Sequence, residues 1–233
     1  MNTGLYRGVA ALSVAQKSMD SIAANLASVS TPGYKRRATA NHGFHVGRFG
    51  SSEVHVASIQ RNDFSQGAIE TTGNPLDLAI QGDGFFELEG DDGPVFTRDG
   101  EFRLLDDGTM VSPEGFAVTW DPRVAQLDPG GEEILVSNEG VVTQGGRTAG
   151  TLKLVAFADN QALRHTSDGY LVADPNLDRT VAVVEVRQKS LERANIDAVE
   201  ELVAMITVQR SHQLAASLIS QIDQSYRRLT AAR

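Results

Sequence analysis

The residues best suited to chemistry in this sequence are carboxylates and histidines, but their spacing matches no catalytic or metal site. Asp91–Asp92 and Asp106–Asp107 are paired acids of the kind that can transfer protons or hold calcium. Each pair precedes a glycine in a predicted turn, and neither has the spacing of an EF-hand loop. His42 and His45 lie three residues apart without a further ligand pattern. The sequence therefore predicts turns here, and no metal or cofactor.

Other catalytic patterns are also missing. The segment Gly82–Glu87 begins like a dinucleotide-binding fingerprint, but it lacks the glycine at the sixth position and a following helix. The sequence contains no Walker loop and no Gly-x-Ser-x-Gly elbow. It contains no cysteine, which excludes disulfides and thiolate chemistry. We therefore expect no catalytic residues and no enzymatic activity.

The charge of the 233-residue chain is unevenly distributed. The formal charge is −9, and residues 82–139 hold 15 acidic residues against three arginines, a net −12 in that stretch alone. This argues against nucleic-acid binding, which needs a basic surface. A solvated acidic surface is the favoured interpretation, and a basic partner is the alternative. No stretch approaches the ~20 apolar residues of a membrane span, and the N-terminus does not resemble a Sec signal peptide.

Residues 3–30 are predicted to form one long helix with an apolar seam. Leu5, Leu12, Met19 and Leu26 lie seven residues apart, and Ala15, Ile22 and Val29 occupy the second seam position, although Gly8 interrupts its start. This is the heptad pattern of a coiled coil. Pro32–Gly33 should end the helix, because proline disfavours helical backbone in the residue before it.

The middle of the chain has a different character. Residues 34–65 are interpreted as an extended arm in which 53–59 alternates like a short strand. From residue 66 to 190, Asp-Gly pairs separate short apolar runs, which is a signal for tight hairpins. The pairs are Asp83–Gly84, Asp92–Gly93, Asp99–Gly100, Asp107–Gly108 and Asp168–Gly169. The predicted strands are 76–81, 85–88, 95–97, 102–105, 110–111, 116–120, 134–136, 141–143, 152–157, 170–172 and 180–187.

Residues 197–232 return to a helical pattern. Asp197, with Glu200 three residues later, resembles a capping box. Val199, Leu202, Val203 and Ile206 form an apolar face that Leu214, Leu218, Ile222 and Leu229 resume. The polar residues between these two blocks include Gln209 and Arg210. Arg210 is expected either to pair with a carboxylate between subunits or to remain solvated.

The fold class is therefore predicted as α+β, with long coiled-coil-like terminal helices flanking a central antiparallel β domain. The predicted segments are an N-terminal helix (1–33), an extended arm (34–65), a β domain (66–190) and a C-terminal helix (191–233). The nearest partner of each apolar stripe is the other terminal helix, but part of each stripe should need neighbouring subunits. The predicted assembly interface is Leu5, Leu12, Met19, Ile22, Leu26, Val29, Val203, Ile206, Arg210, Leu214, Leu218, Ile222 and Leu229.

Four motifs in the sequence resemble those of the flagellar rod and hook protein family. They are Asn25-Leu-Ala-Ser-Val-Ser-Thr-Pro-Gly-Tyr-Lys-Arg36, the segment 74–86, the segment 96–102 and the segment 200–210. Ser28 stands where the family usually has asparagine. The motif residues are Asn25, Leu26, Thr31, Pro32, Gly33, Tyr34, Lys35, Gly73, Asn74, Pro75, Leu76, Gly82, Gly84, Phe85, Phe86, Thr97, Arg98, Gly100, Phe102, Met205 and Gln209. Asn25 should bond exposed backbone near the helix end, and the phenylalanines should be sheet core.

The resemblance implies a structural subunit of the basal-body rod that stacks helically with itself and with other axial proteins. It implies export through the flagellar type III apparatus without a cleaved leader, and neither nucleic-acid binding nor membrane insertion. Hook proteins of this family are generally longer, and distal-rod proteins commonly carry an additional segment after the Lys-Arg motif. Only about thirty residues separate Arg37 from Gly67, so a proximal-rod subunit is favoured over a distal-rod subunit.

Two other functional classes are open on the residues alone. The acidic turns could belong to a carbohydrate-active or other β-domain enzyme, which would need convergent carboxylates in a concave pocket. The terminal helices could instead belong to a soluble binding or chaperone module.

Overall fold

The computed structural model describes residues 3–46, 53–166 and 169–231. It divides into two compact units, which are treated separately below. The helical unit comprises Met1–Val29, Arg36–Asp63 and Ile196–Arg233, and the β unit comprises Ser30–Lys35 and Phe64–Asn195.

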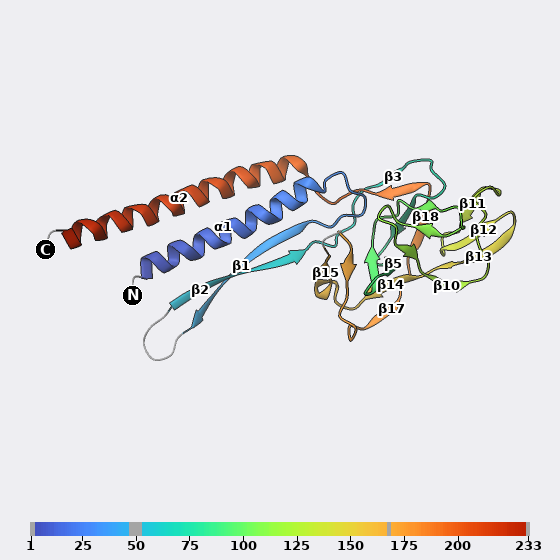
Figure 1. The fold of residues 1–233 in the computed structure, drawn as a ribbon, viewed down its shortest axis with the longest axis horizontal. Helices are drawn as coiled ribbons and strands as arrows, with labels where there is room; N and C mark the ends of the chain where they lie inside the picture. The colour runs from blue at the N-terminus through green and yellow to red at the C-terminus, as the bar shows by residue number, and fades with distance from the viewer. Residues whose placement is uncertain (1–2, 47–52, 167–168, 232–233) are drawn as a thin grey trace. The chain divides into compact units, whose positions relative to one another are not determined.

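The helical unit contains both long helices, α1 (Thr3–Ala27) and α2 (Ala198–Ala231). They run antiparallel, so that the start of α1 and the end of α2 lie at the same end of the unit (Figure 1). The first helix ends earlier than predicted, and Val29 lies beyond it in a turn, because Pro32 and the serines on either side of Val29 disfavour helix. The carboxylate of Asp197 caps α2 by accepting from the N–H groups of Val199 and Glu200, at 2.8 and 3.2 Å.

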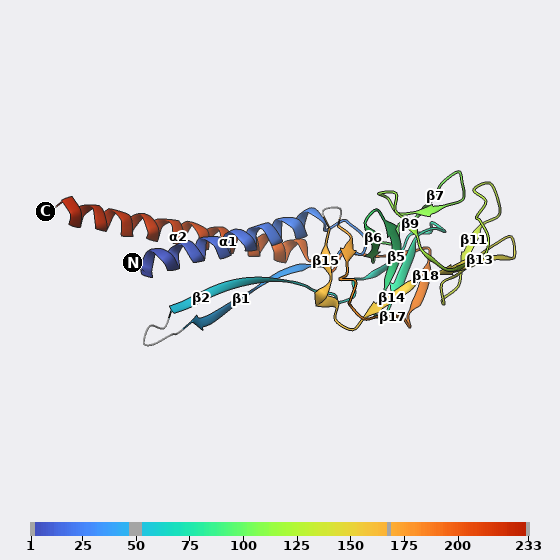
Figure 2. The same ribbon diagram turned by 60° about the horizontal axis from the view of Figure 1, so that its bottom comes forward.

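A long hairpin accompanies α1 in both ribbon views (Figures 1 and 2). Its strands are β1 (Arg37–Val46) and β2 (Glu53–Asn62), paired in continuous antiparallel register from Arg37–Asn62 to Val46–Glu53. The sequence predicted only one short strand here, because glycine and histidine interrupt the alternation of the first strand. Ser21 of α1 links the hairpin to the helix, since its hydroxyl accepts from Thr39 Oγ1 and Gln60 Nε2 at 3.0 and 2.9 Å.

The β unit is built from antiparallel strands in several sheets, which confirms the predicted α+β class. The largest sheet contains β5 (Phe85–Gly90), β6 (Gly93–Thr97), β7 (Arg103–Leu104), β8 (Met110–Val111), β9 (Ala117–Val118), β14 (Leu154–Phe157), β15 (Arg164–His165), β16 (Leu171–Val172) and β17 (Arg179–Val181). A second sheet contains β10 (Trp120–Arg123), β11 (Ile134–Val136), β12 (Val141–Gln144) and β13 (Arg147–Leu152). Two strand pairs complete the unit, β4 (Leu78–Gln81) with β18 (Glu185–Gln188), and β3 (Ile69–Thr71) with β19 (Ser190–Glu192).

The predicted aromatic core is confirmed. Phe85, Phe86, Phe96 and Phe102 are all buried. Phe86 and Phe102 pack edge to face with ring centroids 5.1 Å apart, the geometry that aromatic quadrupoles favour. Two apolar clusters share these rings, one around Phe86 and one around Phe85, so the core lies on both sides of β5.

The Asp-Gly predictions were right at two turns and wrong at two others. Asp92–Gly93 joins β5 to β6, and Asp107–Gly108 joins β7 to β8, as hairpins. Asp83–Gly84 and Asp99–Gly100 instead connect strands that do not pair with each other. Asp168 lies outside the described residues. The predicted strand 180–187 is split between β17 and β18, and β3, β13, β15 and β19 were not predicted. β3 and β19 pair with each other across more than a hundred residues, whereas β13 and β15 pair with the neighbouring strands β12 and β16.

Candidate assembly surface

The face of α2 that packs on α1 is not the one that the sequence indicated. Its buried and half-buried residues recur every three or four positions: Glu201, Met205, Val208, His212, Ala215, Ile219 and Ile222. A Cβ added at Gly8 would lie 2.7 Å from Ile219 Cγ1, so the glycine that interrupts the predicted seam is a point of close approach to α2. Small residues at Gly8 and Ala215 therefore allow the two backbones to come close.

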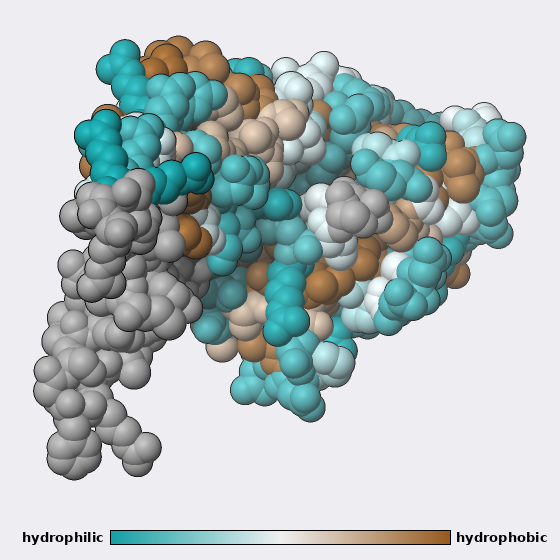
Figure 3. Space-filling view, turned by 60° about the vertical axis from the view of Figure 1, so that its left-hand side comes forward, coloured by the Kyte–Doolittle hydropathy of each residue, from teal (hydrophilic) through white to brown (hydrophobic). Residues whose placement is uncertain are grey.

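The predicted apolar face of α2 points away from α1. Val199, Leu202, Val203, Ile206, Leu214 and Leu218 are between 48% and 69% exposed. The expectation that α1 is their nearest partner was wrong, because the other face of the helix fills that place. Brown surface lies along the top of the space-filling view, where α2 runs (Figure 3). Contiguous exposed apolar surface of this kind marks an interaction site.

The predicted seam of α1 is packed inside its own unit. Ile22 is buried and Leu12, Met19 and Leu26 are half-buried. The side chains of Leu5 and Leu229 lie outside the described residues. The structure therefore separates the predicted interface into an inner set, made of the α1 residues and Ile222 of α2, and an outer set on α2. Arg210 is exposed in the middle of the outer set and makes no ion pair in the part of the chain that the structure describes.

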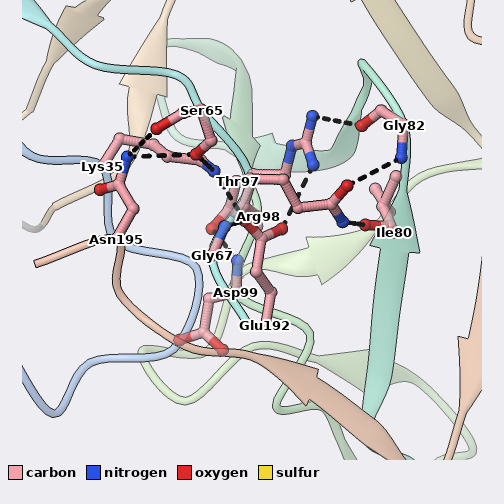
Figure 4. Close-up of polar contacts among 11 residues, drawn as sticks. Lys35, Ser65, Gly67, Ile80, Gly82, Thr97, Arg98, Asp99, Glu192 and Asn195 are labelled. Atoms are coloured by element: carbon pink, nitrogen blue, oxygen red, sulfur yellow. Dashed lines mark hydrogen bonds and ion pairs between the residues drawn. The ribbon is translucent and has the colours of Figure 1, made fainter. Parts of the chain in front are cut away.

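The residues of the first and third motifs meet inside the β unit at a buried ionic cluster (Figure 4). Glu192 of β19 accepts from Lys35 Nζ at 2.6 Å on one oxygen and from Arg98 Nη1 at 3.2 Å on the other. The backbone N–H of Gly67 donates to the same carboxylate at 2.8 Å. Lys35, Arg98 and Glu192 are 2%, 3% and 0% exposed.

Two further contacts of this cluster are to backbone oxygen, whereas Arg98 Nε is buried without a hydrogen-bond partner among the described residues. Lys35 Nζ donates to the Ser65 carbonyl at 2.8 Å, and Arg98 Nη2 donates to the Gly82 carbonyl at 2.7 Å. Burial lowers the pKa of Arg98, whereas the charge of Glu192 raises it. Two cations thus depend on one carboxylate in a site that excludes water, where loss of the counter-charge is costly.

Glycines of the motifs allow backbone segments of the β unit to approach each other closely near the ionic cluster. A Cβ at Gly100 would lie 1.6 Å from the Leu78 carbonyl oxygen, and one at Gly33 would lie 2.2 Å from the Arg98 carbonyl carbon. Gly33 also has a φ of 67°, which favours glycine. The second motif begins with a turn in which Asn74 Nδ2 donates to Asp77 Oδ1 at 2.7 Å. The first three motifs therefore specify contacts within the β unit.

Asn25 has the backbone-bonding role that was predicted, but its partner is the start of the hairpin. Its side chain, buried within the helical unit, donates to the Arg37 carbonyl at 2.9 Å and accepts from the Arg37 N–H at 2.8 Å. In the same unit, Arg36 Nε lies 2.5 Å from the buried carboxylate of Glu201 on α2. The fourth motif supplies that acid, whereas Met205 faces α1 and Gln209 is exposed.

Sequence reasoning missed Glu192 and Glu201, the acids that neutralise the motif cations. The only available signal was indirect, because Lys35 and Arg98 stand beside aromatic or apolar residues in motifs of predicted core. Such cations need a buried partner, but nothing in the sequence around residue 192 identifies it.

Among the described residues, the acidic turns form no group of three or more side chains that could hold a metal ion. Asp91, Asp92 and Asp174 line one hollow of the β unit, and Asp128, Glu132 and Glu133 line another. Burial raises the pKa of Asp99 to about 7, and Glu101, Glu114 and Asp77 add to the shift.

In the described part of the chain, neither helix is long and apolar enough to cross a membrane.

An exposed apolar helix face, together with motif residues held by buried contacts, is typical of structural proteins that assemble through their surfaces. Residues 79–144 match the family model described as the flagellar hook protein FlgE/F/G D1 domain. Residues 187–232 match the flagellar basal body rod FlgEFG protein C-terminal model. The chain is 31% identical to the flagellar basal-body rod protein FlgF of Mesorhizobium japonicum, over 97% of this chain and 95% of the relative.

Relatives of a second type are similar almost to the same degree. The chain is 29% identical to the FlgG protein of Agrobacterium fabrum, over 90% of this chain and 91% of the relative, and 27% identical to that of Bacillus subtilis, over 96% of each. The chain belongs to the flagellar basal-body rod protein family. It is accordingly a structural subunit of the flagellar basal body, where it assembles with other axial proteins.

Proposed function

We propose that this chain is a proximal-rod subunit that polymerises through the outward face of α2 and has no catalytic role. The observation that carries the proposal is the set of six exposed apolar side chains on a helix whose opposite face is already packed. Because these side chains are 48–69% exposed, burying the rest of each would contribute about half to two thirds of the roughly 1.5–3 kcal/mol expected for full burial. The helix pair would then form part of a coiled-coil-like inner tube, with torque transmitted from copy to copy.

The length of the chain supports the proximal position. The match to the Mesorhizobium FlgF protein extends over 233 positions, whereas those to the Agrobacterium and Bacillus FlgG proteins extend over 246 and 258. The FlgG matches cover no more of this chain, so they require additional gaps. The strands β1 and β2 account for most of the interval between Arg37 and Gly67, which supports the interpretation that the additional distal-rod segment is missing or shortened. The distal rod is the alternative.

Export through the type III apparatus without a cleaved leader is part of the same proposal. The helical unit supports it, because neither helix alone can bury both of its faces. Such an element gains much of its stability only after assembly, as is suitable for a chain that travels unfolded.

The test is a substitution on the outward face. Ile206→Asp places a charge in the proposed interface and should abolish swimming in a strain that lacks the native chain. Ser211→Asp adds the same charge at an exposed site of the same helix and should leave swimming intact. Circular dichroism of both purified variants should match that of the native protein. Normal swimming with Ile206→Asp would contradict the proposed interface.

The rod position is tested by the composition of basal bodies isolated from the deletion strain. A proximal subunit is needed before the distal rod can form, so the distal-rod protein should be absent by mass spectrometry. Basal bodies that retain a distal rod would contradict the proximal assignment, and retention of the other proximal subunits alone agrees with it.

A further inference from the structure

We infer that the outward face of α2 binds the outward face of α1 of a second copy, with Arg210 paired to Asp20. This inference rests on the proposed polymerisation and names the surface that covers the exposed helix face. The outward face of α1 is proposed as the partner because its size, charge and axial position complement those of the outward face of α2.

The outward face of α1 consists mainly of small side chains and carries one acidic residue, Asp20. Val9, Ser13, Gln16, Asp20, Ala23 and Ala27 recur at alternating intervals of four and three, and all are exposed. They lie away from the residues that face α2, such as Ile22, and from Ser21 and Asn25, which bond the hairpin. Among residues 8–27, whose side chains the structure describes, Val9 is the one large apolar side chain on this face.

Between residues 199 and 214, the outward face of α2 is bulky and carries one base. Val199, Val203, Ile206, Arg210 and Leu214 recur every three or four residues. Large side chains on one helix and small ones on the other allow knobs to enter holes at a short interaxial distance. The single arginine would otherwise oppose burial of this face, so a suitable partner must present a carboxylate at the same level.

Asp20 stands at that level. Contact between Gly8 and Ile219 fixes the antiparallel pair, so Asp20 is level with Thr207 and Lys17 with Arg210 to within about one turn. Three residues of offset correspond to about 4.5 Å along the axis. Helical side chains lean toward the N-terminus of their own helix, so Arg210 and Asp20 lean toward each other in antiparallel helices.

Asp20 is available for such a pair. One of its oxygens accepts from Gln16 Nε2 at 2.9 Å on the exposed surface, and the carboxylate can accept further bonds. A guanidinium–carboxylate pair buried between helices would supply the register that apolar contacts alone specify weakly.

The contact cannot form within one chain. The two outward faces belong to helices that use their other faces to pack on each other, so each outward face must meet a different copy. A contact between two unlike surfaces is heterologous and repeats from copy to copy, generating a ring or a shallow helix when neighbours lie at similar axial levels.

Charge reversal tests the pairing. Asp20→Arg and Arg210→Asp each place like charges together and should abolish swimming, and the double variant should restore it. If both single variants fail to swim and the double variant also fails, the Arg210–Asp20 pairing is overturned. Assembly through the outward face of α2 would not be contradicted by that result. Unchanged swimming in both single variants also overturns the pairing. Absence of the native chain from isolated basal bodies would instead refute the proposed function.

Disulfide trapping tests the same contact without a charge change. The native chain has no cysteine, so Ala23→Cys with Val203→Cys provides an isolated pair on the two proposed faces. Mild oxidation of basal bodies should give dimers and higher species of this chain, whereas Ala23→Cys with Ser211→Cys should give none. Only monomers, or cross-links to a different axial protein, would overturn the inference.

Discussion

Replacing Glu192 by glutamine removes the carboxylate that contacts both Lys35 and Arg98, the two buried cations of the β unit. The side chain keeps its shape and one carbonyl oxygen, which can still accept from the Gly67 N–H. The new amide group, however, can only donate, and it would point at Lys35 or Arg98, which are themselves donors. Two cations would then share a buried site without compensation.

The expected loss in free energy of unfolding is about 3–5 kcal/mol, the usual cost of breaking a buried ion pair from one side. Glu70→Gln is a matched control, because Glu70 lies on the strand paired with β19 and bonds Arg193 at 3.1 Å. That pair is 57% and 62% exposed, so its loss should cost less than about 1 kcal/mol.

Urea unfolding of the full chain measures both values. Trp120, the single tryptophan, lies in β10 of the β unit and reports its unfolding by fluorescence. The account predicts a much lower midpoint for Glu192→Gln and an almost unchanged midpoint for Glu70→Gln. Equal midpoints would refute the argument that the motif cations stabilise the β unit through Glu192.

Three further predictions concern other contacts. Burial raises the pKa of Asp99 to about 7, so the folded state binds more protons than the unfolded state between about pH 4 and 7, and stability falls as pH rises through this window. Asp99→Asn should remove about 2 kcal/mol of that fall between pH 5 and 8, and an unchanged pH slope in urea unfolding would contradict it. Gly100→Ala forces a Cβ against the Leu78 carbonyl and should cost more than about 3 kcal/mol. Gly130→Ala meets only ordinary contact and should be nearly neutral, so similar melting temperatures for the two variants would count against close packing at Gly100. Asn25→Ala leaves the backbone N–H and carbonyl of Arg37 without their bonds and should cost about 1–3 kcal/mol. Hydrogen exchange at the Arg37 amide should then accelerate, and unchanged protection would show that Asn25 does not hold the hairpin.

Much of the fold was predictable because its signals are local. The capping aspartate, the apolar repeats of the two helices and the phenylalanine core all follow from residue type and spacing. The Asp-Gly pairs show the limit of such signals. Asp92–Gly93 makes a hairpin, whereas Asp99–Gly100 has the same residues but joins β6 to β7, two strands of one sheet that do not pair, and Gly100 is needed there for close contact with Leu78.

The inner face of α2 was not predictable in the same way. Hydrophobicity indicated Val203, Ile206 and Leu214, yet the helix packs through its other face, where apolar residues such as Ile219 alternate with small or polar ones such as Ala215 and Glu201. A single chain gives no indication of which apolar side its own fold covers and which side another copy covers. The buried acid Glu192 was missed for a related reason, since its partners are more than ninety residues away.

The most direct measurement is an electron cryo-microscopy map of isolated basal bodies at side-chain resolution. The account predicts that this chain forms part of the rod and that Val199, Val203, Ile206 and Leu214 are buried between neighbouring subunits. A rod that contains the chain with this face of α2 open to solvent, or one that lacks the chain altogether, would contradict it.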